Sequence, residues 1–212
     1  MKIKLLIVLT ILLSSLSLSA MDIQKAQTPK KKKAQTTLGL YVTAKNAGEY
    51  IAKNKNATLI DVRSPSEIMF IGSASRTDIY VPFMTLDTTA YGKKHNNYAM
   101  KKNKYALKEI IYELDKKDVK KDEPIFITCR SGSSRAAPVV NQLASKGYTN
   151  VWTIIDGFEG GKVKQGKYKG ERVKDGWLHS GLAWTWKVPV EKLWFECKYK
   201  DLFSKEDALN CK

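Results

Sequence analysis

The segment best suited to chemistry is a seven-residue stretch that begins with a cysteine and ends with an arginine. It comprises Cys129, Arg130, Ser131, Gly132, Ser133, Ser134 and Arg135. The two arginines offer forked donors to an oxyanion, and Gly132 permits a tight turn. Between a buried strand and the start of a helix, successive backbone N–H groups converge and the helix dipole adds partial positive charge. The stretch therefore predicts an anion-binding loop around a cysteine.

Such surroundings favour the ionised form of Cys129. A free cysteine titrates near ~8.5, and a helix N-terminus or nearby arginines can lower its pKa to roughly 3.5–7.5. We therefore expect an exposed, nucleophilic thiolate that would also be open to oxidation. The alternative is a buried, inert thiol, which the glycine, serine and arginine residues behind Cys129 disfavour. For Arg135 taken alone, the alternative is a surface ion pair.

The flanking residues predict the elements that hold this loop. Residues 125–128 are apolar and β-prone, as in a strand buried in a parallel sheet, and residues 136–145 follow as a helix that ends at Gly147. Further strands are expected at 58–62, 78–82 and 151–155, and helices at 44–54, from 64 and at 105–114. Strands alternating with helices indicate an α/β fold of three layers, with a central, mainly parallel sheet flanked by helices.

The remaining segments divide the chain. Residues 1–20 have a basic start, an apolar middle and small residues at the end, which is typical of a secretory signal peptide. Residues 21–42, with the run Lys30 to Lys33, predict a basic and flexible lead-in. The polar stretch 84–103 predicts a long surface loop. The expected protein is periplasmic or secreted, without stable membrane insertion once the signal is removed.

Charge and cysteine content limit the function. The 212 residues carry 37 Lys+Arg against 21 Asp+Glu, a net charge of +16. Because export disfavours nucleic acid, this charge favours small anions, acidic partner proteins or an anionic membrane surface. Three cysteines without C-x-x-C spacing exclude a structural zinc module. In an oxidising compartment, Cys197 and Cys211 are expected to form a disulfide, with two free thiols as the alternative.

Several motifs resemble the rhodanese-like sulfurtransferases, in the order and approximate spacing of that family. They are Leu59–Glu67, Val81–Pro82, Ile127–Gly132, Gly147–Val151, Asp156–Gly160, Gly176–Trp177 and Gly181–Trp184. The resemblance covers about residues 43–186, which would form a rhodanese-like domain, and it leaves 187–212 as a C-terminal extension. It is greatest to exported single-domain members.

The resemblance implies a reaction and its participants. Cys129 would take a sulfane sulfur from thiosulfate or a related small anionic donor and hold it as a persulfide. A thiol or cyanide would then accept the sulfur, with no metal and no organic cofactor. Residues 130–135 would bind the donor and the leaving group. A protein partner in the periplasm, such as a reducing protein, is compatible with this scheme.

The loop departs from the family pattern in length. Many members have four residues between the cysteine and the second arginine, whereas five residues separate Cys129 from Arg135. A loop of this length resembles those of the related phosphatases and arsenate reductases, although Thr128 stands where phosphatases have histidine. A phosphatase or arsenate-reductase-like enzyme is therefore the second hypothesis. A non-catalytic sulfur-carrier or binding module is the third.

Overall fold

A computed structural model describes residues 22–93, 96–209 and 211. The predicted signal peptide, residues 1–20, lies outside the described residues. Within them, no helix has both the length and the apolar character needed to cross a bilayer.

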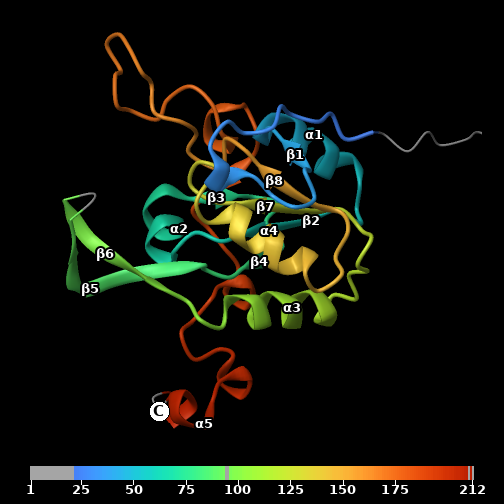
Figure 1. The fold of residues 1–212 in the computed structure, drawn as a ribbon, viewed down its shortest axis with the longest axis vertical. Coiled ribbons are helices and arrows are strands. Elements are labelled where there is room, and N and C mark those ends of the chain that lie inside the picture. Colours follow the sequence, from blue (N-terminus) through green and yellow to red (C-terminus); the bar gives the residue numbers. More distant parts are fainter. Residues whose placement is uncertain (1–21, 94–95, 210, 212) are drawn as a thin grey trace, which may run out of the picture.

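The centre of the fold is a sheet of five parallel strands (Figure 1). Its spatial order is β1 (Tyr41–Val42), β8 (Val151–Ile154), β7 (Ile125–Thr128), β2 (Thr58–Asp61) and β4 (Ile79–Tyr80). All four pairings are parallel, so the carboxyl ends of the strands share one edge. The predicted α/β fold with a central parallel sheet is therefore confirmed.

Helices connect the strands, and their starts follow local capping chemistry. They are α1 (Ala44–Lys53), α2 (Pro65–Ile71), α3 (Ala106–Lys116), α4 (Ala136–Ala144) and α5 (Lys205–Leu209). Short 3-10 turns occur at η1 (Lys32–Ala34), η2 (Trp177–His179), η3 (Val190–Lys192) and η4 (Lys200–Leu202). The side chain of Thr43 accepts the Asn46 N–H at 3.3 Å and caps α1. Ser64 and Glu67 form a capping box at the start of α2.

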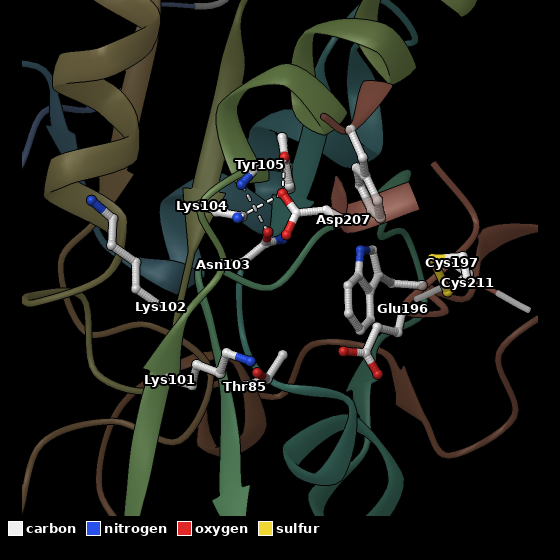
Figure 2. Close-up of a pocket in the computed structure, with 12 residues that line it drawn as sticks. Thr85, Lys101, Lys102, Asn103, Lys104, Tyr105, Glu196, Cys197, Asp207 and Cys211 are labelled. Atoms are coloured by element: carbon white, nitrogen blue, oxygen red, sulfur yellow. Dashed lines mark hydrogen bonds and ion pairs between the residues drawn. A yellow bond between two sulfur atoms is a disulfide. The ribbon is translucent and has the colours of Figure 1, made fainter. Parts of the chain in front are cut away.

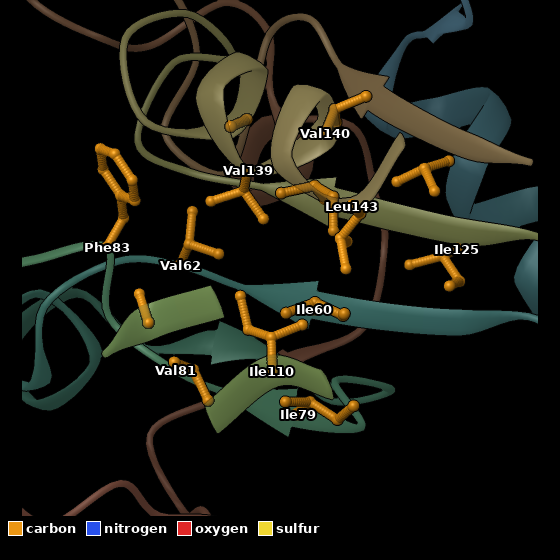
Figure 3. Close-up of a cluster of buried hydrophobic side chains, with 14 of the residues drawn as sticks. Ile60, Val62, Ile79, Val81, Phe83, Ile110, Ile125, Val139, Val140 and Leu143 are labelled. Carbon is orange, nitrogen blue, oxygen red and sulfur yellow. The ribbon is translucent and has the colours of Figure 1, made fainter. Parts of the chain in front are cut away.

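Two apolar clusters cover the two faces of the sheet and create the three layers. In one cluster, side chains from α3 and α4 pack on strand residues: Ile110, Leu114, Val139, Val140 and Leu143 contact Ile60, Ile125 and Ile127 (Figure 3). In the other, α1 and η2 cover Phe126 and Trp152. Successive strand residues point to opposite faces, which is why Phe126 and its neighbour Ile127 belong to different clusters.

The prediction of a long loop at 84–103 is wrong. Strands β5 (Met84–Gly92) and β6 (Asn97–Lys102) form an antiparallel hairpin that projects from the body of the fold (Figure 1). Most of its side chains are exposed on both faces, so the strands carry Thr, Lys and Asn instead of an apolar core pattern. A further short pair joins β3 (Ser73–Ala74) to β9 (Trp184–Thr185).

The predicted flexible lead-in is attached to the domain. Ala34 is buried, the Thr37 N–H donates to Asn141 Oδ1 on α4 at 2.9 Å, and Tyr41 already belongs to the central sheet. The lead-in is polar in sequence, but its backbone finds partners on the body of the fold, which sequence periodicity does not reveal.

Candidate active site

The stretch from Cys129 to Arg135 lies where the sequence predicts it. Cys129 directly follows β7, and Arg135 is the residue that precedes α4. We refer to residues 129–135 as the cysteine loop. It leaves the central strand of the sheet at the carboxyl edge, where open α/β folds bind ligands.

In the cysteine loop, two backbone carbonyl groups accept hydrogen bonds, whereas the backbone N–H groups are unpaired within the described chain. The carbonyl oxygens of Cys129 and Arg130 accept the N–H groups of Phe158 and Glu159 at 2.8 and 2.9 Å. Within the described chain, the N–H groups of residues 130–135 have no hydrogen-bond acceptor, and no side chain caps α4. A row of unpaired N–H groups at a helix start attracts an anion.

Two glycines allow the loop to pack this closely. Gly132 has φ +66°, and a Cβ there would lie 2.1 Å from backbone atoms of Ile155. Gly157 has φ +64°, and a Cβ there would lie 2.3 Å from the Cys129 oxygen and 2.7 Å from the N atoms of Ser131 and Gly132. The segment after β8 is therefore shaped to hold the loop backbone.

The expectation of an exposed thiol is wrong. Cys129 is only 2% exposed and belongs to the apolar cluster beneath α4. Its position immediately after a fully buried strand explains the burial, because the chain has not yet emerged from the core. The residue therefore offers very little surface to a reagent in this conformation.

Arg135 is held by a carboxylate that the sequence analysis missed. Its Nη2 donates to Glu67 Oε1 at 2.7 Å, and its Nη1 donates to Glu67 Oε2. Burial alone would raise the pKa of Glu67, but the hydrogen bonds and charge of Arg135 lower it to about 2. Burial alone would lower the pKa of Arg135, but the hydrogen bonds and charge of Glu67 raise it above its ordinary value.

Arg130 is the more available of the two arginines. Its side chain is 49% exposed, and its Nε lies 2.9 Å from Glu159 Oε1 in an ion pair without hydrogen-bond alignment. Its terminal guanidinium nitrogens have no partner among the described residues. Arg130 can therefore contact an anion from solvent, while Arg135 is committed to Glu67.

A second buried ion pair supports the neighbouring strand end. Arg63 Nη2 donates to Asp61 Oδ2 at 2.7 Å and to the Gly72 oxygen at 2.8 Å, and both charged side chains are fully buried. The guanidinium lies 3.9 Å from the centre of the Phe158 ring. This pair links the end of β2 to the segment that holds the cysteine loop, a positioning role that the motif alone did not reveal.

Asp156 connects the same segment to two distant parts of the chain. Its carboxylate accepts the Ala44 N–H at 2.7 Å and the Gly176 N–H at 3.0 Å. Burial raises the pKa of Asp156, although these hydrogen bonds lower it in part. Asp156 thereby fixes the start of α1 and the turn before η2 next to the cysteine loop.

The serines of the loop are not used by the protein itself. Ser131 and Ser133 are half-buried and Ser134 is exposed, and their hydroxyls make no hydrogen bond to a described residue. His179 lies in η2, away from the loop in sequence, and His95 falls outside the described residues. Across the parts of the chain that are described, no group of His, Cys, Asp or Glu side chains could hold a metal ion.

A cavity lies at the carboxyl ends of β2 and β4. It measures about 340 Å³, and its lining includes Arg63, Ile68 and Tyr80 of the domain and Val188 and Trp194 of the extension. It is mostly apolar and does not include Cys129. The predicted site residues are thus together in one loop, and none of residues 129–135 lines this cavity.

Comparison with known proteins adds the following. A family model described as the rhodanese-like domain matches residues 43–164. No curated protein matches the chain. Among solved structures, the crystal structure of Rv0390 from M. tuberculosis is similar, with a TM-score of 0.52 and 26% identity over 69% of this chain and 97% of that one.

Two further solved structures are similar at lower scores. A rhodanese-related protein from Thermoplasma volcanium has a TM-score of 0.37 and 21% identity, over 70% of this chain and 99% of that one. The polysulfide-sulfur transferase homodimer from Wolinella succinogenes has a TM-score of 0.37 and 21% identity, over 57% of this chain and 68% of that one. The family match covers more than half of the sequence and includes the strand, loop and helix around Cys129, and on that ground the chain belongs to the rhodanese-like domain family.

Proposed function

We propose that this protein is a sulfurtransferase in which Cys129 accepts a sulfane sulfur from thiosulfate or a related anionic donor. The observation that carries the proposal is the row of unpaired N–H groups at residues 130–135, directly after the only cysteine outside the disulfide. Membership of the rhodanese-like family supports the same reaction class.

The proposed reaction consists of two displacements at sulfur. The Cys129 thiolate attacks the outer sulfur of thiosulfate, the S–S bond of the donor breaks, and sulfite leaves with the electron pair. Cyanide or a thiolate then attacks the outer sulfur of the Cys129 persulfide, and Cys129 leaves as the thiolate. Both steps balance without an oxidant or a reductant.

The loop residues have different roles in this scheme. The N–H groups of residues 130–135 bind the sulfonate oxygens of the donor, because they are the free donors closest in sequence to the nucleophile. The exposed guanidinium of Arg130 attracts the donor and the leaving sulfite. Arg135 is a positioning residue, since Glu67 already engages both of its terminal nitrogens.

Access to the nucleophile requires motion of the loop. Cys129 is 2% exposed, while Arg130 and Ser134 of the same loop are exposed. We propose that donor binding to the free N–H groups draws the outer part of the loop away from the sulfur. The Glu67–Arg135 ion pair opposes this motion, because it ties the end of the loop to α2.

Intact-mass measurement tests the proposal directly. Protein incubated with thiosulfate should gain the mass of one sulfur atom, and cyanide should remove it. Cys129→Ser is expected to gain nothing, and Cys197 and Cys211 remain in their disulfide as an internal control. Absence of the adduct with thiosulfate and with other sulfane donors would overturn the proposed function.

The second candidate is a phosphatase or arsenate-reductase-like activity, which the five residues between Cys129 and Arg135 favour. A longer row of N–H groups suits a tetrahedral phosphate or arsenate as well as a sulfonate. Turnover of an aryl phosphate or reduction of arsenate, without sulfur loading, would support this candidate. Sulfur loading without either turnover would exclude it. Loading without transfer to cyanide or thiols would indicate a sulfur carrier.

We also propose that the protein works in the periplasm or outside the cell. The pattern of residues 1–20 and the Cys197–Cys211 disulfide support this location. Cell fractionation should recover a protein shortened at its N-terminus, and recovery of the full-length chain from the cytoplasm would contradict it.

A further inference from the structure

A basic arm follows the segment that holds the cysteine loop. It spans residues 161–175 and projects from the body of the fold, where Figure 1 draws it in orange. Two hydrogen bonds join its two sides: the Val163 N–H donates to the Glu171 oxygen at 2.8 Å, and the Val163 oxygen accepts the Gly170 N–H at 2.9 Å. The family match ends at residue 164. The arm is therefore a closed loop that lies mostly outside the family match.

The base of the basic arm lies beside the cysteine loop. Arg172 Nη1 donates to the oxygen of Gly160. Gly160 directly follows Glu159, whose N–H donates to the Arg130 oxygen at 2.9 Å and whose Oε1 lies 2.9 Å from Arg130 Nε. Burial lowers the pKa of Arg172, and the positive charge of Arg130 lowers it further, so the two guanidinium groups lie within electrostatic reach of each other. A partner held by the arm would therefore lie next to the loop.

The basic arm carries more positive charge than its own acids balance. Residues 161–175 contain six Lys+Arg against two Asp+Glu. One of the acids, Asp175, already accepts the Gly161 N–H at 2.5 Å and pairs with Lys174 Nζ at 3.1 Å. Within the described chain, four exposed lysines of the arm have no carboxylate at ion-pair distance, namely Lys162, Lys164, Lys167 and Lys169. Four cations on one short segment are thus available to an acidic partner.

The open form of the arm suits a polypeptide. An added Cβ at Gly166 or Gly170 would meet no atom within 4 Å, so the arm is not packed against the body there. Its free lysines are spaced along the chain, and acidic side chains spaced along a partner can pair with them separately. Tyr168, between two of these lysines, is 48% exposed, and tyrosine is enriched among the residues that anchor protein interfaces. A second copy of this chain, with its net charge of +16, would be repelled.

We propose that the basic arm is the docking site for an acidic protein that accepts sulfur from Cys129. The inference rests on the proposed sulfur transfer and names the partner class of its second displacement. Acidic residues of the partner pair with the arm, which raises the effective concentration of the partner's thiolate at the loop. That thiolate attacks the outer sulfur of the Cys129 persulfide, the S–S bond breaks, and Cys129 leaves as the thiolate. The partner then carries the persulfide.

Two thiol peptides of opposite charge test this docking site. They have the same length and one cysteine each, and one is rich in glutamate and the other in lysine. Each is mixed with protein loaded from thiosulfate, and intact mass follows the loss of sulfur from Cys129. In the arm variant, Lys162→Gln/Lys164→Gln/Lys167→Gln/Lys169→Gln, the ratio of the acidic-peptide rate to the basic-peptide rate should fall roughly tenfold at low salt. The same two peptides are used with every protein, so differences in their thiol reactivity cancel.

A matched control removes the same charge at the other ends of the helices. Four exposed lysines lie at or just after the carboxyl ends of α1, α3 and α4, namely Lys55, Lys116, Lys117 and Lys146. Their replacement by glutamine should keep the ratio within about twofold of the wild type. An equal fall in both variants would overturn the proposal, because overall charge and not the arm would then select the peptide.

Direct binding separates this inference from the proposed function. Fluorescence anisotropy of the acidic peptide, with serine in place of its cysteine, needs no sulfur on Cys129. Tyr168→Ser should weaken this binding about threefold, whereas Tyr112→Ser, at a tyrosine that is 47% exposed on α3, should not. If the arm binds the peptide but Cys129 never loads sulfur, the proposed function fails and the docking surface stands. If Cys129 loads and the arm variant keeps the wild-type ratio, the docking surface fails and sulfur transfer stands.

Discussion

The cysteine loop and the C-terminal extension hold sulfur under opposite conditions. In the loop, Cys129 is a buried free thiol that a parallel sheet places and that unpaired N–H groups follow in the chain. In the extension, Cys197 and Cys211 are bonded to each other at the surface (Figure 2), and side-chain contacts such as Tyr199 with Glu113 and Asp207 with Tyr105 hold that segment against α3 and the residue before it. Backbone groups shape the cysteine loop, whereas side-chain contacts hold the extension in place.

This difference teaches which substitutions matter in each region. Backbone geometry is changed by altering a glycine, and a backbone N–H cannot be removed by ordinary side-chain replacement. Side-chain contacts can be removed singly, with a small cost each. We therefore expect a single substitution at one or two positions to disrupt the cysteine loop. Each single substitution in the extension should lower its stability by only a small amount.

The largest effect is expected from Gly157→Ala. The new Cβ would lie 2.3 Å from the Cys129 oxygen, at a backbone conformation that alanine avoids. We expect a loss of about 3 kcal/mol in the free energy of unfolding and abolition of sulfur loading in the intact-mass assay. Gly166→Ala is the control, because φ is +79° there and nothing lies within 4 Å. It should cost about 1 kcal/mol and leave loading intact. Equal effects of the two variants would show that the loop does not depend on close packing.

Glu67→Gln should have the next largest effect and should depend on pH. The fold lowers the pKa of Glu67 from 4.5 to about 2, so its charged form contributes stability that is complete above 4.5 and is lost as the pH falls toward 2. We expect the variant to be about 2 kcal/mol less stable at neutral pH, and the gap to close across that window. Chemical denaturation at several pH values measures it.

The same variant should loosen the loop. Alkylation of Cys129 should become faster in Glu67→Gln, since one tie between the loop and α2 is weakened. Glu49 is exposed on α1, so Glu49→Gln is the control. It should change neither the stability of the protein nor the rate of Cys129 alkylation. A pH-independent stability gap, or unchanged alkylation, would mean that the ion pair does not restrain the loop.

Removing the disulfide should have a smaller effect on the loop. In Cys197→Ser/Cys211→Ser, amide hydrogen exchange should rise across residues 197–211, because the cross-link no longer limits the motion of that segment. Sulfur loading of Cys129 should change by less than about twofold, because no hydrogen bond or ion pair joins residues 197–211 to the cysteine loop within the described chain. Loss of loading in this variant would show that the extension and the loop act as one unit.

The smallest effect is expected from Tyr199→Phe. The Tyr199 hydroxyl is buried and donates to Glu113 Oε1 at 2.8 Å, so its loss should cost about 1 kcal/mol, seen as faster exchange near residue 199. Tyr112→Phe is the control, because Tyr112 is 47% exposed and its hydroxyl makes no hydrogen bond to a described residue. No change in amide exchange near residue 199, or the same change in both variants, would show that the hydrogen bond from Tyr199 to Glu113 does not help to hold the extension.

The sequence was sufficient to predict the elements that carry a periodic apolar pattern. The strand at 125–128 and the helix that follows the cysteine loop were predicted because each has a simple pattern and a clear boundary. The hairpin at 84–102 was missed because both of its faces are exposed, and alternation of burial was therefore absent. The pattern of a strand is visible only where one face is buried.

The position of the candidate site could be predicted from the sequence, but the side chains that pair with its arginines could not. The cysteine, the glycine and both arginines stand together in the chain, so the loop could be placed from the sequence. The partners of the arginines could not, since Glu67 is 68 residues from Arg135 and reaches it only through the packing of α2 beside α4. The burial of Cys129 likewise depends on where β7 ends relative to the core and not on the residue types of the loop.

The two-residue strands at the borders of the central sheet have a consequence for behaviour at high concentration. β1 and β4 offer few free backbone groups, so another chain finds little along which to extend the sheet. The β5–β6 ribbon is longer and has open sides, but Lys93, Lys101 and Lys102 place positive charge on it. Mutual repulsion of these ribbons favours dispersed molecules over fibrous aggregates, and this protection weakens as the salt concentration rises.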